Sequence, residues 1–199
     1  DFALGDTGAM AGHSPPATVA ALARRAGELG GITTMLPTED AQWVAAELTR
    51  RFRMPKWSFT LSASDANRWA LRIGRMVTGR PKVLAFSYSY HGSVDETFAI
   101  VGPDGATTTR PGNVGPPIEI GSTTVAAEFN DLESVEQALA GRDVAVLITE
   151  PAMTNIGIVL PESGFLEGLR ELCDRYGTLL LIDETHTFSA GPGGCTAAW

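Results

Sequence analysis

Residues 144–186 read VAVLITEPAMTNIGIVLPESGFLEGLRELCDRYGTLLLIDETH, and this stretch decides the fold. Two apolar runs, at 144–148 and 179–182, have the length and continuity of strands that are buried on both faces. Between them, residues 165–176 carry apolar side chains at helical spacing, and Gly177 stands where a helix C-cap belongs. Strand, helix and strand in this order predict a βαβ unit. The sequence therefore predicts an α/β fold with a mostly parallel sheet flanked by helices.

Further elements are expected on the N-terminal side of this unit. Helices are predicted over three ranges: 16–29, 38–52 and 64–77. Strands are predicted over two short ranges: 58–61 and 82–86. Asn130 and Glu133 have the spacing of a capping box for a helix that runs to Ala140. Residues 102–123 are rich in Gly, Pro and Thr, and we expect them to cross the surface as a loop.

Composition excludes several classes of function. The chain has 199 residues, of which 44% are hydrophobic and 19% charged, and this is the composition of a globular protein. Its formal net charge of -8 repels a phosphate backbone, so no nucleic-acid partner is expected. No apolar run is long enough to span a membrane, and no secretory leader is visible. Two cysteines, Cys173 and Cys195, make no disulfide framework, so a cytoplasmic location is expected.

Polar residues follow the predicted strands at the points where those strands end. They are Ser62, Ala63 and Ser64 after 58–61, Tyr90 and His91 after 82–86, Glu150 after 144–149, and Asp183, Thr185 and His186 after 179–182. The carboxyl ends of parallel strands meet at one edge of a sheet, and ligands of open α/β sheets bind there. We therefore expect these side chains to gather at one rim.

Each cluster has an ordinary structural interpretation beside the functional one. Residues 62–65 could form only an N-cap, or a helix start whose free N–H groups hold a phosphate. Tyr90 could be a surface tyrosine, or a flat ring that stacks on another flat ring. Asp183 could cap a turn, or aim a carboxylate into a crevice. The residues alone leave these alternatives open.

Other chemistries find little support. Asp183, Glu184 and His186 are too close together on an extended segment to converge on a metal ion, and no other histidine completes a ligand motif. The chain has no G-x-S-x-G nucleophile elbow, no phosphate-binding P-loop and no G-x-G-x-x-G fingerprint. No metal site is therefore expected.

Five motifs, in chain order, resemble those of the class III, fold type I, pyridoxal-phosphate (PLP) aminotransferases, and most nearly the members similar to glutamate-1-semialdehyde aminomutase. They are Gly12-His13-Ser14-Pro15, Ser62-Ala63-Ser64-Asp65-Ala66-Asn67, Tyr90-His91-Gly92, the stretch from Glu150 to Gly157, and Asp183-Glu184-Thr185-His186-Thr187. The resemblance covers nearly the whole chain and implies PLP as the cofactor.

The resemblance also implies roles for individual residues. Asp183 would lie beside the pyridine nitrogen, where a buried carboxylate favours the charged pyridinium that serves as an electron sink. Ser62, Ala63 and Ser64 would surround the phosphate. Tyr90, which is next to His91 in its motif, would stack on one face of the ring. Thr185 would pack on the other face. His186 would lie near the ring hydroxyl, and Glu150 and Asn155 would line the pocket.

The chain departs from the family pattern in two ways. Ala63 replaces a glycine and Thr185 a valine, which indicates a divergent branch. The family's Schiff-base lysine follows the Asp-Glu motif, whereas the only lysines here, Lys56 and Lys82, precede Tyr90. We therefore expect an N-terminal, large-domain fragment that lacks the lysine strand and the C-terminal small domain and is inactive by itself.

The expected domains are an N-terminal segment with helices at 1–50 and an incomplete PLP-binding large domain at 51–199. The expected activity is amino-group transfer between small molecules, by an aminotransferase or an aminomutase that forms a homodimer. Two alternatives remain: another fold type I activity, such as a decarboxylase or racemase, and a truncated homologue without catalysis.

Overall fold

The computed structural model describes residues 1–5, 8–31, 36–113, 115 and 118–198. The chain divides into two compact units, Asp1–Ser58 and Phe59–Trp199. The first unit contains two helices, α1 (Pro16–Gly27) and α2 (Glu39–Phe52). The hydroxyl of Thr38 accepts a hydrogen bond from the N–H of Ala41 and so caps α2.

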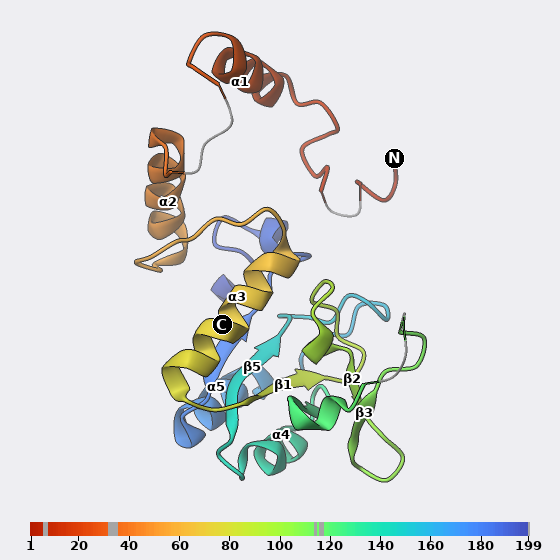
Figure 1. The fold of residues 1–199 in the computed structure, drawn as a ribbon. Helices are drawn as coiled ribbons and strands as arrows, with labels where there is room; N and C mark the ends of the chain where they lie inside the picture. Colours follow the sequence, from red (N-terminus) through yellow and green to blue (C-terminus); the bar gives the residue numbers. More distant parts are fainter. Residues whose placement is uncertain (6–7, 32–35, 114, 116–117, 199) are drawn as a thin grey trace. The chain divides into compact units, whose positions relative to one another are not determined.

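The second unit is built on a four-stranded parallel sheet (Figure 1). The strands lie in the order β4-β1-β5-β6, and their bounds are β1 Lys82–Phe86, β4 Thr124–Ala127, β5 Val144–Thr149 and β6 Leu179–Ile182. The predicted strands at 82–86, 144–148 and 179–182 are thus confirmed, and so is the α/β fold with a mostly parallel sheet flanked by helices.

Helices cover both faces of this sheet. On one face, Leu71 of α3 (Ala63–Thr78) packs against Val83 and Val146. On the other face lie α4 (Leu132–Leu139) and α5 (Phe165–Tyr176). Here the ring of Phe86 lies 5.4 Å from that of Phe129 and 5.8 Å from that of Phe165. The continuous apolar strands are therefore buried from both sides, as parallel strands require.

The residues predicted to begin or end helices α3 and α5 do so in the structure. Ser62 caps α3 by accepting the N–H of Asp65, and Gly79 ends the helix at a φ of 69°. Gly177 ends α5 at a φ of 67°. These left-handed positions favour glycine because it has no Cβ.

Several expectations about local structure were wrong. Residues 58–61 form no strand, because this segment has no neighbour in the sheet with which to pair. The cap of α4 is Asp131, which accepts the N–H of Ser134, instead of Asn130. Asn130 instead uses its side chain to hold the segment at 160–162.

The segment at 102–123 contains more structure than a loop. Strand β3 (Thr107–Thr109) pairs antiparallel with β2 (Ala99–Val101). Residues Ile120–Ser122 form the short 3-10 helix η2. Further 3-10 helices lie outside this segment: η1 Asp95–Thr97, η3 Phe188–Ala190 and η4 Thr196–Ala198. Residues 114, 116 and 117 of this segment lie outside the described residues.

Within the described ranges, no helix combines the length and apolar character needed to cross a membrane.

Gly74 allows α3 to approach β5 closely. A Cβ at this position would lie 2.2 Å from Cγ2 of Val146, a branched side chain fixed in the sheet. Alanine is normally the better helix former by about 1 kcal/mol. Here the collision outweighs that gain, because α3 must move away from the sheet.

We predict that Gly74→Ala lowers the free energy of unfolding by about 2 kcal/mol, measured by urea denaturation of the purified protein. Gly168→Ala in α5 is the matched control, since its nearest obstacle is the end of the Leu132 side chain, which can rotate. A Gly74→Ala protein as stable as the wild type would show that α3 does not depend on this close approach.

Candidate functional site

The carboxyl ends of β1, β5 and β6 bring three buried polar side chains to one edge of the sheet. His91, Glu150 and Asp183 are 1%, 3% and 7% exposed, respectively. Asp183 follows β6, and its N–H continues the parallel pairing by bonding to the carbonyl of Thr149. The predicted gathering of polar residues at the strand ends is therefore present for these three strands.

The carboxylate of Asp183 is hydrogen-bonded at both of its oxygens. Its Oδ2 accepts from Nδ2 of Asn67 and bonds with Nδ1 of His91, both at 2.9 Å. Its Oδ1 accepts from the backbone N–H of Thr185 at 3.0 Å and from the Thr185 hydroxyl at 2.6 Å. Helix α3, the loop after β1 and the turn after β6 thus converge on one side chain.

This environment keeps Asp183 ionised. Burial by itself raises the pKa of the carboxyl group, because a charge is poorly solvated in the interior. The hydrogen bonds from His91 and Thr185 stabilise the charged form by more than this, so the pKa of Asp183 lies well below its ordinary value. A fixed negative charge at the carboxyl edge of a parallel sheet can hold a cationic group of a ligand.

The N-terminus of α3 contacts the loop after β1 at Gly92. The hydroxyl oxygen of Ser64 accepts the N–H of Ser93 at 3.1 Å. A Cβ at Gly92, which has a φ of 78°, would lie only 2.0 Å from that oxygen. Ala63 and Ser64 open the helix, so their N–H groups have no acceptor within it. This geometry suits an anion at the helix start.

The carboxylate of Glu150 is the centre of a second hydrogen-bonded group at this edge of the sheet. Glu150 Oε2 accepts from the Thr154 hydroxyl at 2.7 Å, and that hydroxyl lies 2.5 Å from Nδ1 of His186. The other carboxylate oxygen of Glu150 accepts the N–H of Tyr90 at 3.4 Å. The loops after β1, β5 and β6 are therefore linked by one buried carboxylate.

Three other predicted site residues, Tyr90, Asn155 and Ser62, have side chains outside these two hydrogen-bonded groups. The side chain of Tyr90 is 39% exposed and can offer its ring to a ligand. Asn155 is exposed, and its amide donates to the carbonyl of Tyr88 at 3.3 Å instead of to the buried network. Ser62 uses its hydroxyl as the helix cap.

Sequence reasoning missed two residues at this edge, Asn67 and Thr154. Asn67 is 6% exposed and bonds both to Asp183 and to the backbone carbonyl of His91. Both residues stand inside motifs that the sequence presents, and their motif positions were the only available signal. Their partners are distant along the chain, so no local pattern indicated the contacts.

The lysine within this unit lies at the wrong end of the sheet. Lys82 opens β1, and its Nζ pairs with Asp143, just before β5, at 2.8 Å. In a parallel sheet this is the amino edge, opposite the edge that carries Asp183. Lys82 therefore cannot supply an amino group to the site.

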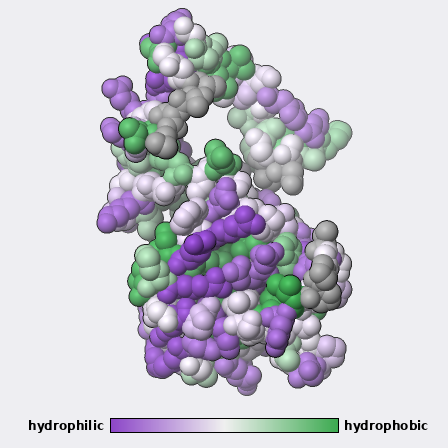
Figure 2. All heavy atoms as spheres, viewed as in Figure 1, coloured by the Kyte–Doolittle hydropathy of each residue, from purple (hydrophilic) through white to green (hydrophobic). Residues whose placement is uncertain are grey.

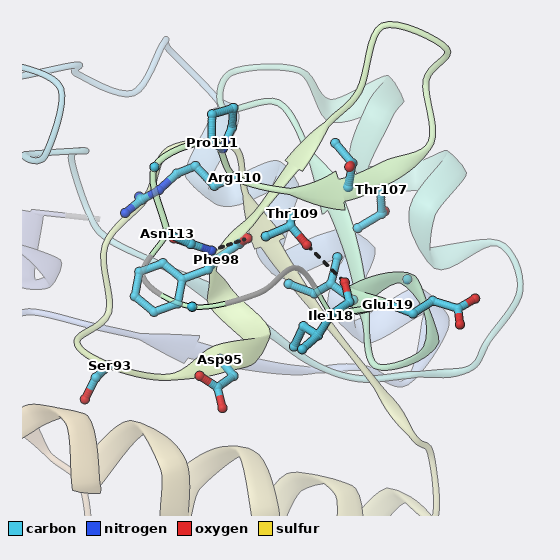
Figure 3. A pocket seen from close by; sticks show the side chains of 15 residues that line it. Ser93, Asp95, Phe98, Thr107, Thr109, Arg110, Pro111, Asn113, Ile118 and Glu119 are labelled. Carbon is cyan, nitrogen blue, oxygen red and sulfur yellow. Dashed lines mark hydrogen bonds between the residues drawn. The ribbon is translucent and has the colours of Figure 1, made fainter.

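A hollow of about 1030 Å³ lies next to the site, beside β3 and η2 (Figure 3). Ser93, which binds Ser64, is one of its lining residues. Thr109 donates across it to the carbonyl of Ile118, and Arg110 lies over the ring of Phe98. Among the described residues, no cluster of His, Cys, Asp and Glu side chains is arranged to hold a metal ion.

Comparison with known proteins identifies the class to which this chain belongs. The family model described as "Aminotransferase class-III" matches residues 1–199, and the chain belongs to that family. The suspected resemblance is thereby confirmed. The structural neighbours include aminotransferases, which agrees with the fold.

Particular relatives are similar over the whole chain. A glutamate-1-semialdehyde 2,1-aminomutase of Bordetella avium is 38% identical over 196 residues, covering 96% of this chain and 45% of the relative. The crystal structure of a glutamate-1-semialdehyde-aminomutase from Pseudomonas aeruginosa PAO1 is 52% identical, with a TM-score of 0.94, over 100% of this chain and 43% of that one. A variant of that protein was solved in complex with PMP.

A more distant structural relative has a different activity. An omega-transaminase from Sphaerobacter thermophilus is 29% identical, with a TM-score of 0.90, over 100% of this chain and 47% of that one. The chain thus spans less than half the length of the relatives that it matches.

The contact between Gly92 and Ser64 gives a test of the helix start. We predict that Gly92→Ala lowers the free energy of unfolding by about 2–3 kcal/mol, because a left-handed φ and the collision with Ser64 act together. Gly105→Ala is the matched control: its φ is 80°, but no atom lies within 4 Å of the added Cβ.

Gly105→Ala should therefore cost only the backbone strain, about 1 kcal/mol. Urea denaturation of both variants measures the difference between them. Equal losses would show that Gly92 is needed for its backbone conformation alone and that its closeness to Ser64 has no energetic importance.

Proposed function

We propose that this chain supplies the cofactor-binding part of an enzyme that transfers amino groups with PLP. The observation that carries the proposal is the buried carboxylate of Asp183, held ionised by His91 and Thr185 at the carboxyl edge of the sheet. A protonated pyridine nitrogen is the cationic group that such a carboxylate would bind. Family membership and the PMP-containing relative support the same cofactor.

The residues present fit a phosphate at one end of the cofactor. Ala63 and Ser64 offer N–H groups at the start of a 16-residue helix, and the Ser64 hydroxyl has a proton left to donate after it accepts from Ser93. The absence of a Cβ at Gly92 keeps this corner open. Ser62 would contribute its position as the cap, since its side-chain oxygen already accepts a hydrogen bond.

The residues also fit an aromatic ring at the other end. When bound, PLP supplies an electron sink that stabilises negative charge at the amino-bearing carbon. Asp183 would keep the ring nitrogen protonated. Tyr90 would stack on one face of the ring, and Thr185 would lie at the other with its hydroxyl turned to Asp183. Glu150, His186 and Asn155 would line the polar rim.

These residues bind and orient, but they do not include an amine. Lys82 is at the opposite edge of the sheet, and Lys56 belongs to the other compact unit. We therefore propose that the Schiff-base lysine of the whole enzyme is not among the 199 residues of this chain. The substrates would be a small-molecule amino donor and acceptor, with aminotransferase and aminomutase activity as the two forms of the reaction.

We predict that Asp183→Asn in the full-length enzyme lowers kcat by several orders of magnitude while the protein remains folded. Asparagine has a similar shape but no charge, so the ring nitrogen would lose its ionic partner. Stopped assays with amino donors and with a semialdehyde substrate measure both forms of the activity, and circular dichroism checks the fold.

Asp174→Asn is the matched control, because Asp174 is exposed on α5 and pairs only with Arg170 among the described residues. It should retain full activity. Near-normal turnover of Asp183→Asn would contradict the proposed site, even if Asp174→Asn behaved as expected.

We also propose a homodimer in the cytoplasm. Trp69, Ile73, Met76 and Val77 lie on the outward side of α3 and are each at least half exposed. Figure 2 shows apolar residues exposed among polar ones on the molecular surface. A row of large apolar side chains on one helix is typical of a surface that another surface covers. Two free cysteines agree with a reducing compartment.

Sedimentation velocity of the full-length protein should give the mass of two subunits, with no monomer at micromolar concentration. The physical reason is the apolar surface on α3, whose exposure to water is unfavourable. Trp69→Lys should shift the distribution toward monomer, whereas Glu162→Lys, away from α3, should not. A stable monomer that retains the bound cofactor would contradict the proposed dimer.

A further inference from the structure

Glu150, Thr154 and His186 form a hydrogen-bonded chain that is separate from the Asp183 network. The Thr154 hydroxyl lies between the other two groups, 2.7 Å from Glu150 Oε2 and 2.5 Å from His186 Nδ1. The carboxylate of Glu150 is almost fully buried, with 4% of its side chain exposed, whereas His186 keeps 22%. The chain therefore leads from the interior to the rim of the site.

The donors and acceptors in this chain have a fixed direction. Both oxygens of Glu150 act as acceptors, one for the Tyr90 N–H and one for the Thr154 hydroxyl. Because a hydroxyl has one proton, Thr154 has none left for His186. Nδ1 of His186 must then carry the proton and donate it to the Thr154 oxygen. In the neutral imidazole, Nε2 is consequently an acceptor.

Among the described residues, one carboxylate lies within ion-pair distance of His186. The nearest carboxylate is Glu150, with Oε2 3.7 Å from Nδ1. Of the neighbours in sequence, Asp183 is occupied by Asn67, His91 and Thr185, and Glu184 bonds to the segment at 195–196. The structure gives no cation in contact with His186 within its described residues, and no partner there for Nε2.

We propose that Thr154 is a positioning residue that fixes the tautomer of His186, so that Nε2 of His186 accepts a hydrogen bond or a proton from an O–H or N–H group of the bound ligand. In the proton transfer, the X–H bond of the ligand breaks, its electron pair stays on X, and an N–H bond forms at Nε2. The Nδ1–H and the Thr154 hydroxyl keep their protons. The identity of the ligand rests on the proposed function, whereas the tautomer does not.

The tautomer is tested by NMR of the unliganded full-length protein, labelled with 15N-histidine. His186→Gln identifies the resonances of His186, and His13, in the other compact unit, serves as the internal control. We expect the neutral ring of His186 to be protonated at Nδ1. We also expect Thr154→Val to abolish this preference for Nδ1, because the acceptor oxygen is lost, and Thr154→Ser to restore it.

Glu150→Gln provides a second test if Thr154→Val is unstable, and it should weaken the preference for Nδ1, because an amide can donate to Thr154 and leave its proton free for Nδ1. A neutral ring protonated at Nε2, or a preference for Nδ1 that neither Thr154→Val nor Glu150→Gln changes, would overturn the proposal. Neither result depends on whether the protein transfers amino groups.

The ligand group is tested with the holoenzyme. If it is a hydroxyl of the cofactor, Thr154→Val should raise the Kd of PLP about tenfold, with Thr154→Ser close to wild type. If it is the ammonium of the substrate, the Kd of PLP should stay unchanged in Thr154→Val, whereas the acid limb of the kcat/KM pH profile should shift. No change in either quantity would overturn the ligand-binding role of His186. An NMR result as expected, with no amino transfer from any donor, would overturn only the proposed function.

Discussion

The buried negative charge of Asp183 sets the requirements that the residues around it fulfil. An ionised carboxylate in the interior is unfavourable unless donors surround it. Here four hydrogen bonds do so, from Asn67 on α3, His91 after β1, and Thr185 in the turn after β6. The start of α3 and two strand ends must therefore be held in register, and Gly74 and Gly92 allow the close packing that this needs.

The two histidines of the edge are oriented by carboxylates in different ways. His91 is fully buried and contacts Asp183 directly, so it stabilises a charge that the protein itself carries. His186 is at the rim and reaches Glu150 through the Thr154 hydroxyl, which leaves its second nitrogen available. Thus His91 stabilises the charge of Asp183, whereas His186, held through Thr154 by Glu150, offers Nε2 as an acceptor.

Local sequence patterns predicted the elements whose stability is local. The strands at 82–86, 144–149 and 179–182 are continuous apolar runs, and Thr38, Gly79 and Gly177 cap helices through contacts a few residues away. The failures have a common cause. The short strand β4 and the absence of a strand at 58–61 depend on which distant segment is available for pairing, and neither segment carries that information.

For the proposed site, motif spacing pointed to Asp183, Tyr90, His91, Glu150 and the helix start at 62–64, because these residues are adjacent in sequence to strand or helix ends. Hydrogen-bond partners were decided only by the folded chain. Asn67 lies 116 residues from Asp183, and Thr154 lies 32 residues from His186, yet both pairs are in contact. Side-chain hydrogen bonds act over about 3 Å, so they depend on the packing of strands and helices that no local pattern encodes.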